Sequence, residues 1–361
     1  MICMIMTIKS FCSRLLSKKQ IAVFIVISIL ASVSLEGCKK VSFREEKTEI
    51  SVGVCIFDEY DTFVNSVAQS MENWCRQKEK ETGIRCVFSV ESAMGSQYTQ
   101  NDQVEKFIAS GVDVLCVNLV DRTDATLIID KAMASDTPVV FFNRELVEED
   151  LERWDKLYYV GTLAEQSGRI QAQIIREDLA DSRKRKEIDV NKNGTIQYIM
   201  LEGEAGHQDT LVRTQVVTDE LKKAGVSLEK LGDEYANWSK DQAKSKMKAL
   251  MERYPFQIEM VIANDDNMAL GALEALEEGD YPTNPYVYGI NGTSEALEAI
   301  RTMRLDGSVY YDTKDMGEKI MGIAYCLAMD TEIPSNIELS FGKYVFLPCS
   351  KITYDNVRDY L

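Results

Sequence analysis

Short apolar runs that alternate with amphipathic segments are the feature of this chain that most restricts its fold. Near-continuous apolar strands between amphipathic helices are typical of a parallel sheet covered by helices on both faces. In the first half of the chain, we predict strands over 50–57, 85–90, 114–119 and 138–143, and helices over 61–80, 102–110 and 123–135.

The same alternation begins again near residue 158. Within one of its predicted helices, 242–253, four apolar residues fall on one face at helical spacing. Two such units predict an α/β fold of two doubly wound parallel-sheet lobes, and such folds bind ligands at the carboxyl ends of the strands. The second series is predicted as strands 158–161, 196–201, 258–263 and 287–290, and helices 165–179, 209–224, 242–253 and 268–277.

The N-terminal segment has the features of an export signal. A pair of lysines precedes an uncharged apolar run over 21–35, which is short for a membrane span and suits the core of a signal peptide. The run ends in Leu35-Glu36-Gly37-Cys38, which resembles a bacterial lipobox with Cys38 as the lipidated residue. A simple N-terminal membrane anchor is the alternative. We predict a lipid-anchored extracytoplasmic protein with a signal peptide over 1–37 and a tether over 38–48.

Charge and length narrow the possible partners. The chain carries a formal net charge of −17, and loss of residues 1–37, which contain four basic residues and one acidic residue, makes it −20. So acidic a body argues against binding to nucleic acid or to anionic lipid surfaces. The 324 residues that remain are too many for one core and suit two lobes.

The cysteines form no pattern typical of metal binding. None of the seven that follow the signal segment belongs to a CxxC pair, and three lie inside apolar strand runs. We predict buried free thiols, although export would permit a disulfide. The seven are Cys38, Cys55, Cys75, Cys86, Cys116, Cys326 and Cys349.

Polar and aromatic residues follow the predicted strands, where a ligand would bind. Aromatic rings stack on the apolar faces of a pyranose, while carboxylate, amide and guanidinium groups suit its hydroxyls. We find no nucleophile beside a base and predict no catalytic residue, although the separation of a carboxylate pair such as Asp61 and Asp265 is open. The strand-end residues are Asp61, Phe63, Asn118, His207, Asp209, Arg213, Trp238, Asp265 and Asn291.

A nine-residue run before one predicted strand has the pattern of a calcium loop. Oxygen-bearing side chains occupy alternate positions, and Gly194 is the sixth residue, where the loop must bend. The twelfth position, which carries a bidentate Glu in an EF-hand, is Met200. The run is therefore either an Asn/Asp-rich turn or a loop whose last ligand comes from elsewhere. Its oxygen-bearing residues are Asp189, Asn191, Asn193, Thr195 and Gln197.

From about residue 50 to its C-terminus the chain resembles the periplasmic galactose/glucose-binding protein family. The order and spacing of several motifs carry the resemblance: Gln100-Asn101-Asp102-Gln103, Asn118-Leu119-Val120-Asp121, Pro138-Val139-Val140-Phe141-Phe142-Asn143, Tyr158-Tyr159-Val160-Gly161-Thr162, Gly206-His207-Gln208-Asp209 and Val261-Ile262-Ala263-Asn264.

The resemblance implies a role for each strand-end residue. Phe63 and Trp238 would stack on the two faces of the sugar ring, and Phe57 would line the pocket where the family has Tyr. Glu259 would supply the last calcium ligand. Hydroxyl contacts are implied for Asp61, Asn118, His207, Asp209 and Arg213.

Two positions depart from the family pattern. Asp265 and Asn291 stand where the family has an Asn followed later by an Asp, which reverses the donor and acceptor roles at the two positions. Asn193 replaces an Asp in the calcium loop, so the metal would meet two carboxylates instead of three. The first departure leaves the exact monosaccharide open, and the second predicts weaker calcium binding.

The resemblance also implies lobe boundaries and partners. It predicts hinge crossings near Asn143, Asp312 and Phe346, with a first lobe of 49–143 and 313–345 and a second of 144–312 and 346–361. A monomer would deliver a galactose- or glucose-type monosaccharide to an ABC-transporter permease. The alternatives are a subunit that presents sugar to a membrane histidine kinase or chemoreceptor, and an extracytoplasmic enzyme. The related lactose-repressor family has the same lobes but needs a helix-turn-helix before the first.

Overall fold

Two sheets of parallel strands organise the part of the chain that the computed structural model describes, residues 47–361. The predicted signal peptide, the lipidation site Cys38 and most of the predicted tether lie outside these residues. Within the described range, no helix is both long enough and apolar enough to cross a membrane. Residues 48–361 belong to one compact unit.

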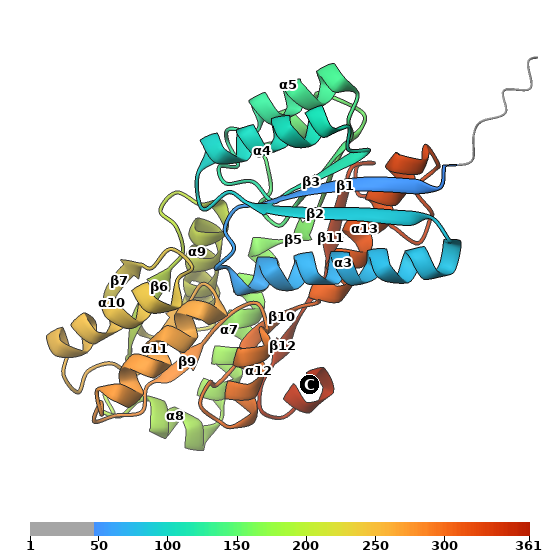
Figure 1. The fold of residues 1–361 in the computed structure, drawn as a ribbon. Coiled ribbons are helices and arrows are strands. Elements are labelled where there is room, and N and C mark those ends of the chain that lie inside the picture. The colour runs from blue at the N-terminus through green and yellow to red at the C-terminus, as the bar shows by residue number, and fades with distance from the viewer. Residues whose placement is uncertain (1–46) are drawn as a thin grey trace, which may run out of the picture. The chain divides into compact units, whose positions relative to one another are not determined.

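The first sheet has six strands in the order β11-β5-β4-β3-β1-β2, all parallel (Figure 1). With its helices it forms what we call the first lobe. Helices α3 and α13 pack on one face, and α4 and α5 on the other. The elements are β1 (Glu49–Ile56), α3 (Thr62–Thr82), β2 (Arg85–Ser92), α4 (Gln97–Ser110), β3 (Val114–Val117), α5 (Thr126–Ser135), β4 (Val139–Phe142), α6 (Glu148–Leu151), β5 (Leu157–Thr162), α13 (Thr313–Met329) and β11 (Tyr344–Leu347).

The second lobe is built on a four-stranded parallel sheet in the order β7-β6-β8-β9. Strand β10 continues it through isolated parallel bridges, and β12 pairs with β10 in the antiparallel direction. The elements are α7 (Ala164–Ala180), α8 (Ser182–Ile188), β6 (Ile196–Glu202), α9 (Gln208–Lys223), β7 (Leu228–Tyr235), α10 (Lys240–Arg253), β8 (Met260–Ala263), α11 (Asp266–Glu278), β9 (Tyr286–Tyr288), α12 (Ser294–Arg301), β10 (Ser308–Tyr311), β12 (Cys349–Ile352) and the 3-10 helix η1 (Val357–Tyr360).

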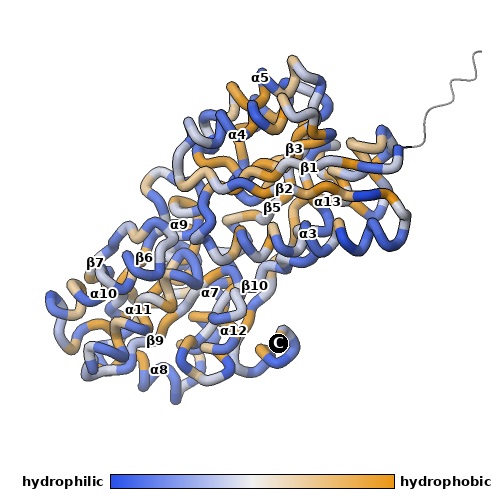
Figure 2. The backbone as a smooth tube through the Cα atoms, viewed as in Figure 1, coloured by the Kyte–Doolittle hydropathy of each residue, from blue (hydrophilic) through white to orange (hydrophobic). Residues whose placement is uncertain are grey.

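Strands buried on both faces account for the apolar runs in the sequence. In β1, Val52 and Val54 join the core beneath α3 and α13, whereas Cys55, the next residue, joins the core beneath α4 and α5. Figure 2 shows hydrophobic strands in the interior and hydrophilic segments along the helices. The predicted α/β fold with two parallel-sheet lobes is confirmed by this arrangement.

One strand lies in a different sheet from the one the sequence indicated. We assigned 158–161 to the second lobe, but β5 pairs with β4 over Val139–Phe142 in the first sheet. The chain therefore first passes to the second lobe between β5 and α7, some twenty residues after Asn143. It returns between β10 and α13, and passes over again at Pro348 between β11 and β12, close to the predicted crossings at Asp312 and Phe346.

Candidate functional site

The carboxyl ends of the strands of both lobes meet around one cavity. Its wall combines three aromatic rings, three carboxylates, two guanidinium groups, two amides and one imidazole. Eight of the nine strand-end residues predicted to bind ligand lie in this wall. The lining residues are Phe57, Asp61, Phe63, Asn143, Arg144, His207, Asp209, Arg213, Trp238, Asp265 and Asn291.

Three helices begin at the cavity, and each is capped by one of its polar residues. Asp61 accepts a hydrogen bond from the Val64 amide at the start of α3, and Asp265 accepts one from the Met268 amide at the start of α11. At the start of α9, His207 Nδ1 accepts from the Asp209 amide at 3.1 Å. Side-chain caps fix the position of each group, and the positive ends of three helices face the cavity.

The imidazole of His207 is held with its second nitrogen free to donate. Since Nδ1 accepts a hydrogen bond, the proton of the neutral ring is on Nε2, which is buried without a partner among the described residues. Burial, with the charges of Arg144 and Arg213, lowers the pKa of His207 to about 4, so the ring is neutral at pH 7. His207 therefore offers one N–H donor to a ligand oxygen.

Trp238 is held against the second lobe by an unusual backbone. Asn237 and Trp238 both have positive φ, of 50° and 60°, which is costly for residues other than glycine. A Cβ at Gly203 would lie 2.1 Å from the Trp238 ring, so only glycine lets the indole approach the strand end this closely. The ring meets His207 edge to face with centroids 5.2 Å apart, and its Nε1 has no partner in the described chain.

Arg213 connects both sides of the second-lobe wall. Its guanidinium donates to Asp209 Oδ2 at 2.7 Å, to the Asn264 carbonyl at 2.9 Å and to the Tyr311 hydroxyl at 3.3 Å. Arg213 Nε is buried without a partner in the described residues. With His207 Nε2 and Trp238 Nε1, three unpartnered N–H donors lie on the second-lobe side of the cavity. Buried polar groups normally have partners, and such exceptions are informative about function.

The carboxylates Asp61 and Asp265 come from opposite lobes and resist ionisation together. Burial is the main cause that raises the pKa of Asp265 well above its ordinary value, and the charge of Asp61 adds to it. Burial likewise raises the pKa of Asp61, while the Val64 amide and Arg144 oppose the shift. The cost of holding two charges here is recovered only if hydrogen-bond donors enter between them.

Asn118 is the predicted site residue that does not line the cavity. Its Oδ1 accepts from the Phe57 amide at 3.3 Å, and its Nδ2 donates to the Phe142 carbonyl at 3.1 Å. The buried amide thus links the ends of β1, β3 and β4, and both of its polar atoms are engaged with backbone.

Asn143 and Arg144 were missed as site residues, although they follow β4 directly. The Arg144 guanidinium stacks 3.7 Å above the centre of the Phe57 ring and donates to both carboxylate oxygens of Glu204 in the second lobe, at 2.9 and 3.2 Å. The strand-end rule that selected the other residues would have selected these two as well.

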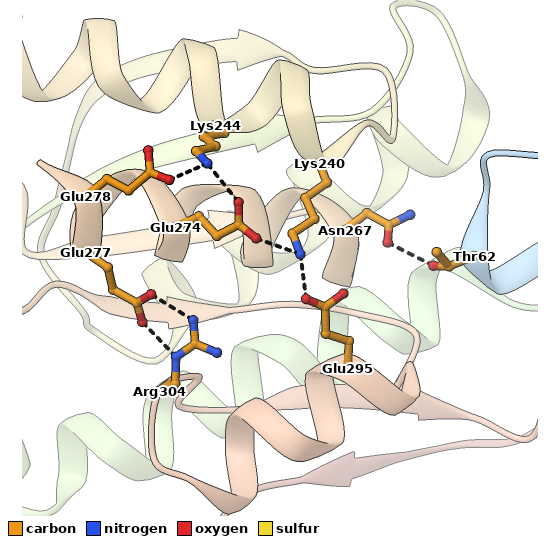
Figure 3. Close-up of polar contacts among 9 residues, drawn as sticks. All are labelled: Thr62, Lys240, Lys244, Asn267, Glu274, Glu277, Glu278, Glu295 and Arg304. Atoms are coloured by element: carbon orange, nitrogen blue, oxygen red, sulfur yellow. Dashed lines mark hydrogen bonds and ion pairs between the residues drawn. The ribbon is translucent and has the colours of Figure 1, made fainter.

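A second polar contact between the lobes lies beside the cavity. Thr62 Oγ1 donates to Asn267 Oδ1 at 2.8 Å, which joins the first turn of α3 to the first turn of α11 (Figure 3). Asn267 Nδ2 also donates to the Trp238 carbonyl at 3.4 Å. Figure 3 also shows the lysine–glutamate pairs between α10 and α11, which are partly exposed to solvent and contribute little to stability.

The two lobes are closed upon each other at this site. The free space inside the cavity is about 30 Å³, enough for one or two water molecules and far below the roughly 300–1,000 Å³ of typical ligand pockets. A monosaccharide therefore needs more room than this closed arrangement offers, and the lobes must separate to admit it. A larger cavity, of about 680 Å³, shares no residue with this site and contains none of the unpartnered donors.

The predicted calcium loop folds around the carboxylate that was predicted to complete it. The side chain of Glu259, just before β8, accepts hydrogen bonds from the backbone N–H groups of Asn191 and Gln197 at 3.3 and 2.9 Å. Asp189 Oδ2 accepts from the Gly194 amide, while Asp189 Oδ1 is buried without a partner within the described chain. Within residues 47–361, no group of three or more His, Cys, Asp or Glu side chains is placed to hold a metal ion. The oxygens present are those of two carboxylates and several neutral side chains, a donor set that suits a hard cation.

Fold and cavity together define a two-lobed solute-binding protein. A family model described as a periplasmic binding protein domain matches residues 52–332, and the chain belongs to this family of proteins that work outside the cytoplasm.

Similar proteins agree with this assignment. The D-galactose/methyl-galactoside binding periplasmic protein of Haemophilus influenzae is 31% identical over 338 residues, which cover 93% of this chain and 98% of that protein. A putative rhizopine-binding protein of Rhizobium meliloti is 28% identical over 86% of this chain and 94% of its own. An ABC transporter solute binding protein from Bacillus halodurans, solved with bound myo-inositol, is 25% identical with a TM-score of 0.71, over 88% of this chain and 98% of that one.

All three relatives are described as binding proteins, and the one from Bacillus halodurans as the solute binding protein of an ABC transporter. The resemblance to the galactose/glucose-binding family and the prediction that the chain is not an enzyme are both confirmed by them.

Proposed function

We propose that this protein captures a galactose- or glucose-type monosaccharide in the cleft between its lobes and presents it to an ABC-transporter permease, while a lipid on Cys38 holds it at the membrane. The observation that supports the sugar most directly is the set of three unpartnered donors, His207 Nε2, Trp238 Nε1 and Arg213 Nε, beside the acceptors Asp209 and Asp265. Ring hydroxyls both donate and accept, so they satisfy both kinds of group at once.

The charge of the wall favours a neutral sugar. Three carboxylates face two guanidinium groups, and Arg144 and Arg213 are already paired with Glu204 and Asp209. A phosphate or uronic-acid carboxylate would meet Asp61 and Asp265, which are held by backbone amides and not by a described ion pair, and their carboxyl groups disfavour an anion. The aromatic rings of Phe63 and Trp238, one from each lobe, supply the apolar surfaces for the faces of a pyranose.

Binding would be coupled to closure of the lobes. A ligand that bonds to Asp61 in the first lobe and to His207 and Asp265 in the second binds the closed arrangement more tightly than the open one, and so shifts the population toward it. The closed shape is what a permease would distinguish.

The test is a thermal-shift and calorimetry panel of hexoses, pentoses, cyclitols and acidic sugars. We expect a neutral hexose to bind saturably in a one-to-one ratio, and glucuronate and glucose 6-phosphate to give no shift. If a cyclitol bound most tightly, the ligand would be a different polyol and not a hexose. If no sugar or cyclitol raised the melting temperature, the proposed sugar binding would be wrong.

We also propose that Ca²⁺ occupies the loop of residues 189–197 with Glu259 and stabilises the second lobe. Asp189 and Glu259 would provide the two carboxylates, and Asn191, Asn193, Thr195 and Gln197 the neutral oxygens. The buried, unpartnered Asp189 Oδ1 supports the proposal.

Calcium titration followed by melting temperature tests this site. We expect saturable stabilisation that chelator reverses and that Glu259→Gln removes. Glu229→Gln, which changes an exposed neighbour bonded to Gln197, is the matched control and should keep the response. Equal responses in the wild type and Glu259→Gln would contradict the assignment.

A further inference from the structure

Two cysteines of the first lobe face each other across the junction of α3 and β2. Cys75 is on the face of α3 that packs on the sheet, and Cys86 is the second residue of β2, eleven positions later in the chain. Their Sγ atoms are 2.7 Å apart. Figure 1 shows α3 lying along the edge of the sheet that β2 forms.

This separation is too short for two thiols that merely pack. Non-bonded carbon atoms are most favourably placed about 3.5–4.0 Å apart, and sulfur is larger than carbon. A disulfide bond is about 2.05 Å long. The two sulfurs are thus closer to bonding distance than to ordinary contact, and the backbone of α3 and β2 already brings them together.

The two thiols differ in access and in acidity, as an oxidisable pair requires. Cys75 is 2% exposed, whereas Cys86 is partly exposed on the edge strand. The Cys75 thiol lowers the pKa of Cys86 and in turn has its own pKa raised. Cys86 is therefore the sulfur that solvent reaches and that forms a thiolate more readily, and the thiolate is the reactive form.

The neighbouring cysteines are less suited to this reaction. Cys116 joins the same core as Cys75, and burial raises its pKa, as it does that of Cys55 on the opposite face of the sheet. Both are fully buried. No other described pair of cysteine sulfurs forms a contact of the kind that joins Cys75 and Cys86.

We propose that Cys75 and Cys86 form an intramolecular disulfide in the exported protein. The proposal uses the location outside the cytoplasm that the family shares, because disulfides persist in such compartments. The Cys86 thiolate attacks a sulfur of an external disulfide, supplied by an oxidoreductase or a small-molecule disulfide, and displaces one thiolate. The Cys75 thiolate then attacks Cys86 Sγ and releases the second. Two protons and two electrons leave the pair, and the external disulfide is reduced to two thiols.

The bond would anchor α3 without entering the sugar site. The residues of this region that line the cavity, Asp61 and Phe63, lie at the N-terminal end of α3, whereas Cys75 is in its C-terminal half. A cross-link over so short a loop restricts mainly the unfolded chain. We therefore expect the bond to change stability and to leave sugar affinity unchanged.

Peptide mapping without reductant is the direct test. Protein exported to a bacterial periplasm, and reduced protein incubated with glutathione disulfide, are alkylated, digested and analysed by mass spectrometry. We expect Cys75 and Cys86 in one cross-linked species, about 2 Da lighter than the dithiol form, with Cys55, Cys116, Cys326 and Cys349 as thiols. Alkylation of both Cys75 and Cys86 in both samples, or a link from Cys75 to Cys116, would overturn the proposal.

Melting temperature gives a second readout. Dithiothreitol should lower the midpoint of the oxidised protein by roughly 5 °C. The midpoint of the double variant Cys75→Ala/Cys86→Ala should not respond to dithiothreitol, whereas that of Cys326→Ala, which lacks a buried thiol outside the pair, should respond as the wild type does. Should the double variant fail to fold, the mapping of the wild type still decides.

Discussion

The two sides of the cleft are built differently. On the second-lobe side, His207, Arg213 and Trp238 each keep one buried donor that has no partner within residues 47–361. On the first-lobe side, Asp61 caps α3 and Arg144 bonds to Glu204. In the binding we propose, the second lobe would supply the free donors to the ligand, and the first lobe would cover it through contacts that join the lobes. Substitutions on the two sides should consequently fail in different ways.

The largest effect is expected for Trp238→Ala. The indole offers a stacking surface and a donor, and its loss from the centre of a binding site costs about 3 kcal/mol, or over 100-fold in affinity. Calorimetry with the tightest sugar of the panel measures it. Phe256→Ala removes a 68% exposed ring of the same lobe and should bind as the wild type does. A Trp238→Ala protein with less than tenfold weaker binding would remove the indole from the site.

Asp265→Asn should weaken binding and stabilise the ligand-free protein. The pKa of Asp265 is raised, so its folded form prefers to be neutral, and its contribution to stability is lost as pH rises through the folded-state pKa. The substitution to Asn removes this loss of stability at higher pH, and the Asn side chain can still cap α11. We expect a higher melting temperature at pH 7 and about 30-fold lower affinity, from roughly 2 kcal/mol of charged hydrogen bonding.

The double variant Asp265→Asn/Asn291→Asp is the matched comparison for that change. It restores the arrangement implied for the galactose/glucose-binding family, so it should recover affinity for galactose or glucose beyond that of Asp265→Asn alone. If the double variant binds every sugar as weakly as the single one, the exchange of these two residues does not determine specificity.

The lowered pKa of His207 leads us to expect that the protein loses stability and sugar affinity in acid. Its pKa is about 4 in the folded protein and about 6.5 when unfolded, so only the unfolded chain takes up a proton between these values. Stability should fall as pH decreases from 6.5 to 4, by up to about 3 kcal/mol, and should be indifferent to this group above pH 6.5. Denaturant titrations from pH 8 to 4 measure the slope.

His207→Asn serves as the control because Asn also caps helices well. It should bind sugar about tenfold more weakly, through loss of the imidazole donor, and should show a shallower acid slope than the wild type. An unchanged slope would show that other groups cause the acid sensitivity.

The smallest effect is expected for Glu204→Gln, which removes the second-lobe partner of the first-lobe residue Arg144. Arg144 is buried but Glu204 is one-third exposed, so solvent screens the pair and its loss is worth about 1 kcal/mol. We expect roughly fivefold faster release of sugar with little change in melting temperature, measured by stopped flow. Glu234→Gln, which breaks an exposed pair with Lys246, should leave release unchanged.

Local patterns predicted most of the fold because each element carries its own period. Long-range pairing was harder to predict, and β5 shows why. Its apolar run fits either sheet, and the segment that joins it to β4 holds only the short, acidic helix α6. Strand β7 was missed since it lies at the edge of its sheet and is rich in charged residues, as edge strands often are.

The predicted strand ends identified the loops that form the site, but they did not predict the direction of every side chain. Asn118 and Arg144 both follow strands of the first sheet. Asn118 bonds to two backbone groups and is hidden, whereas Arg144 reaches over Phe57 into the cavity. The packing of the ends of β1, β3 and β4 decides whether such a side chain is hidden or faces the cavity. The position of a residue in the sequence does not reveal this packing.

With Trp238 in the role we propose, the protein would report its own ligand by fluorescence. The chain has three tryptophans, and only Trp238 lines the cavity, with its ring edge against His207. Trp74 and Trp154 pack in the first lobe beside Lys78 and Lys156. Sugar stacked on the indole would change the polarity around that one fluorophore. Intrinsic emission should then follow occupancy directly, without a label or a coupled assay.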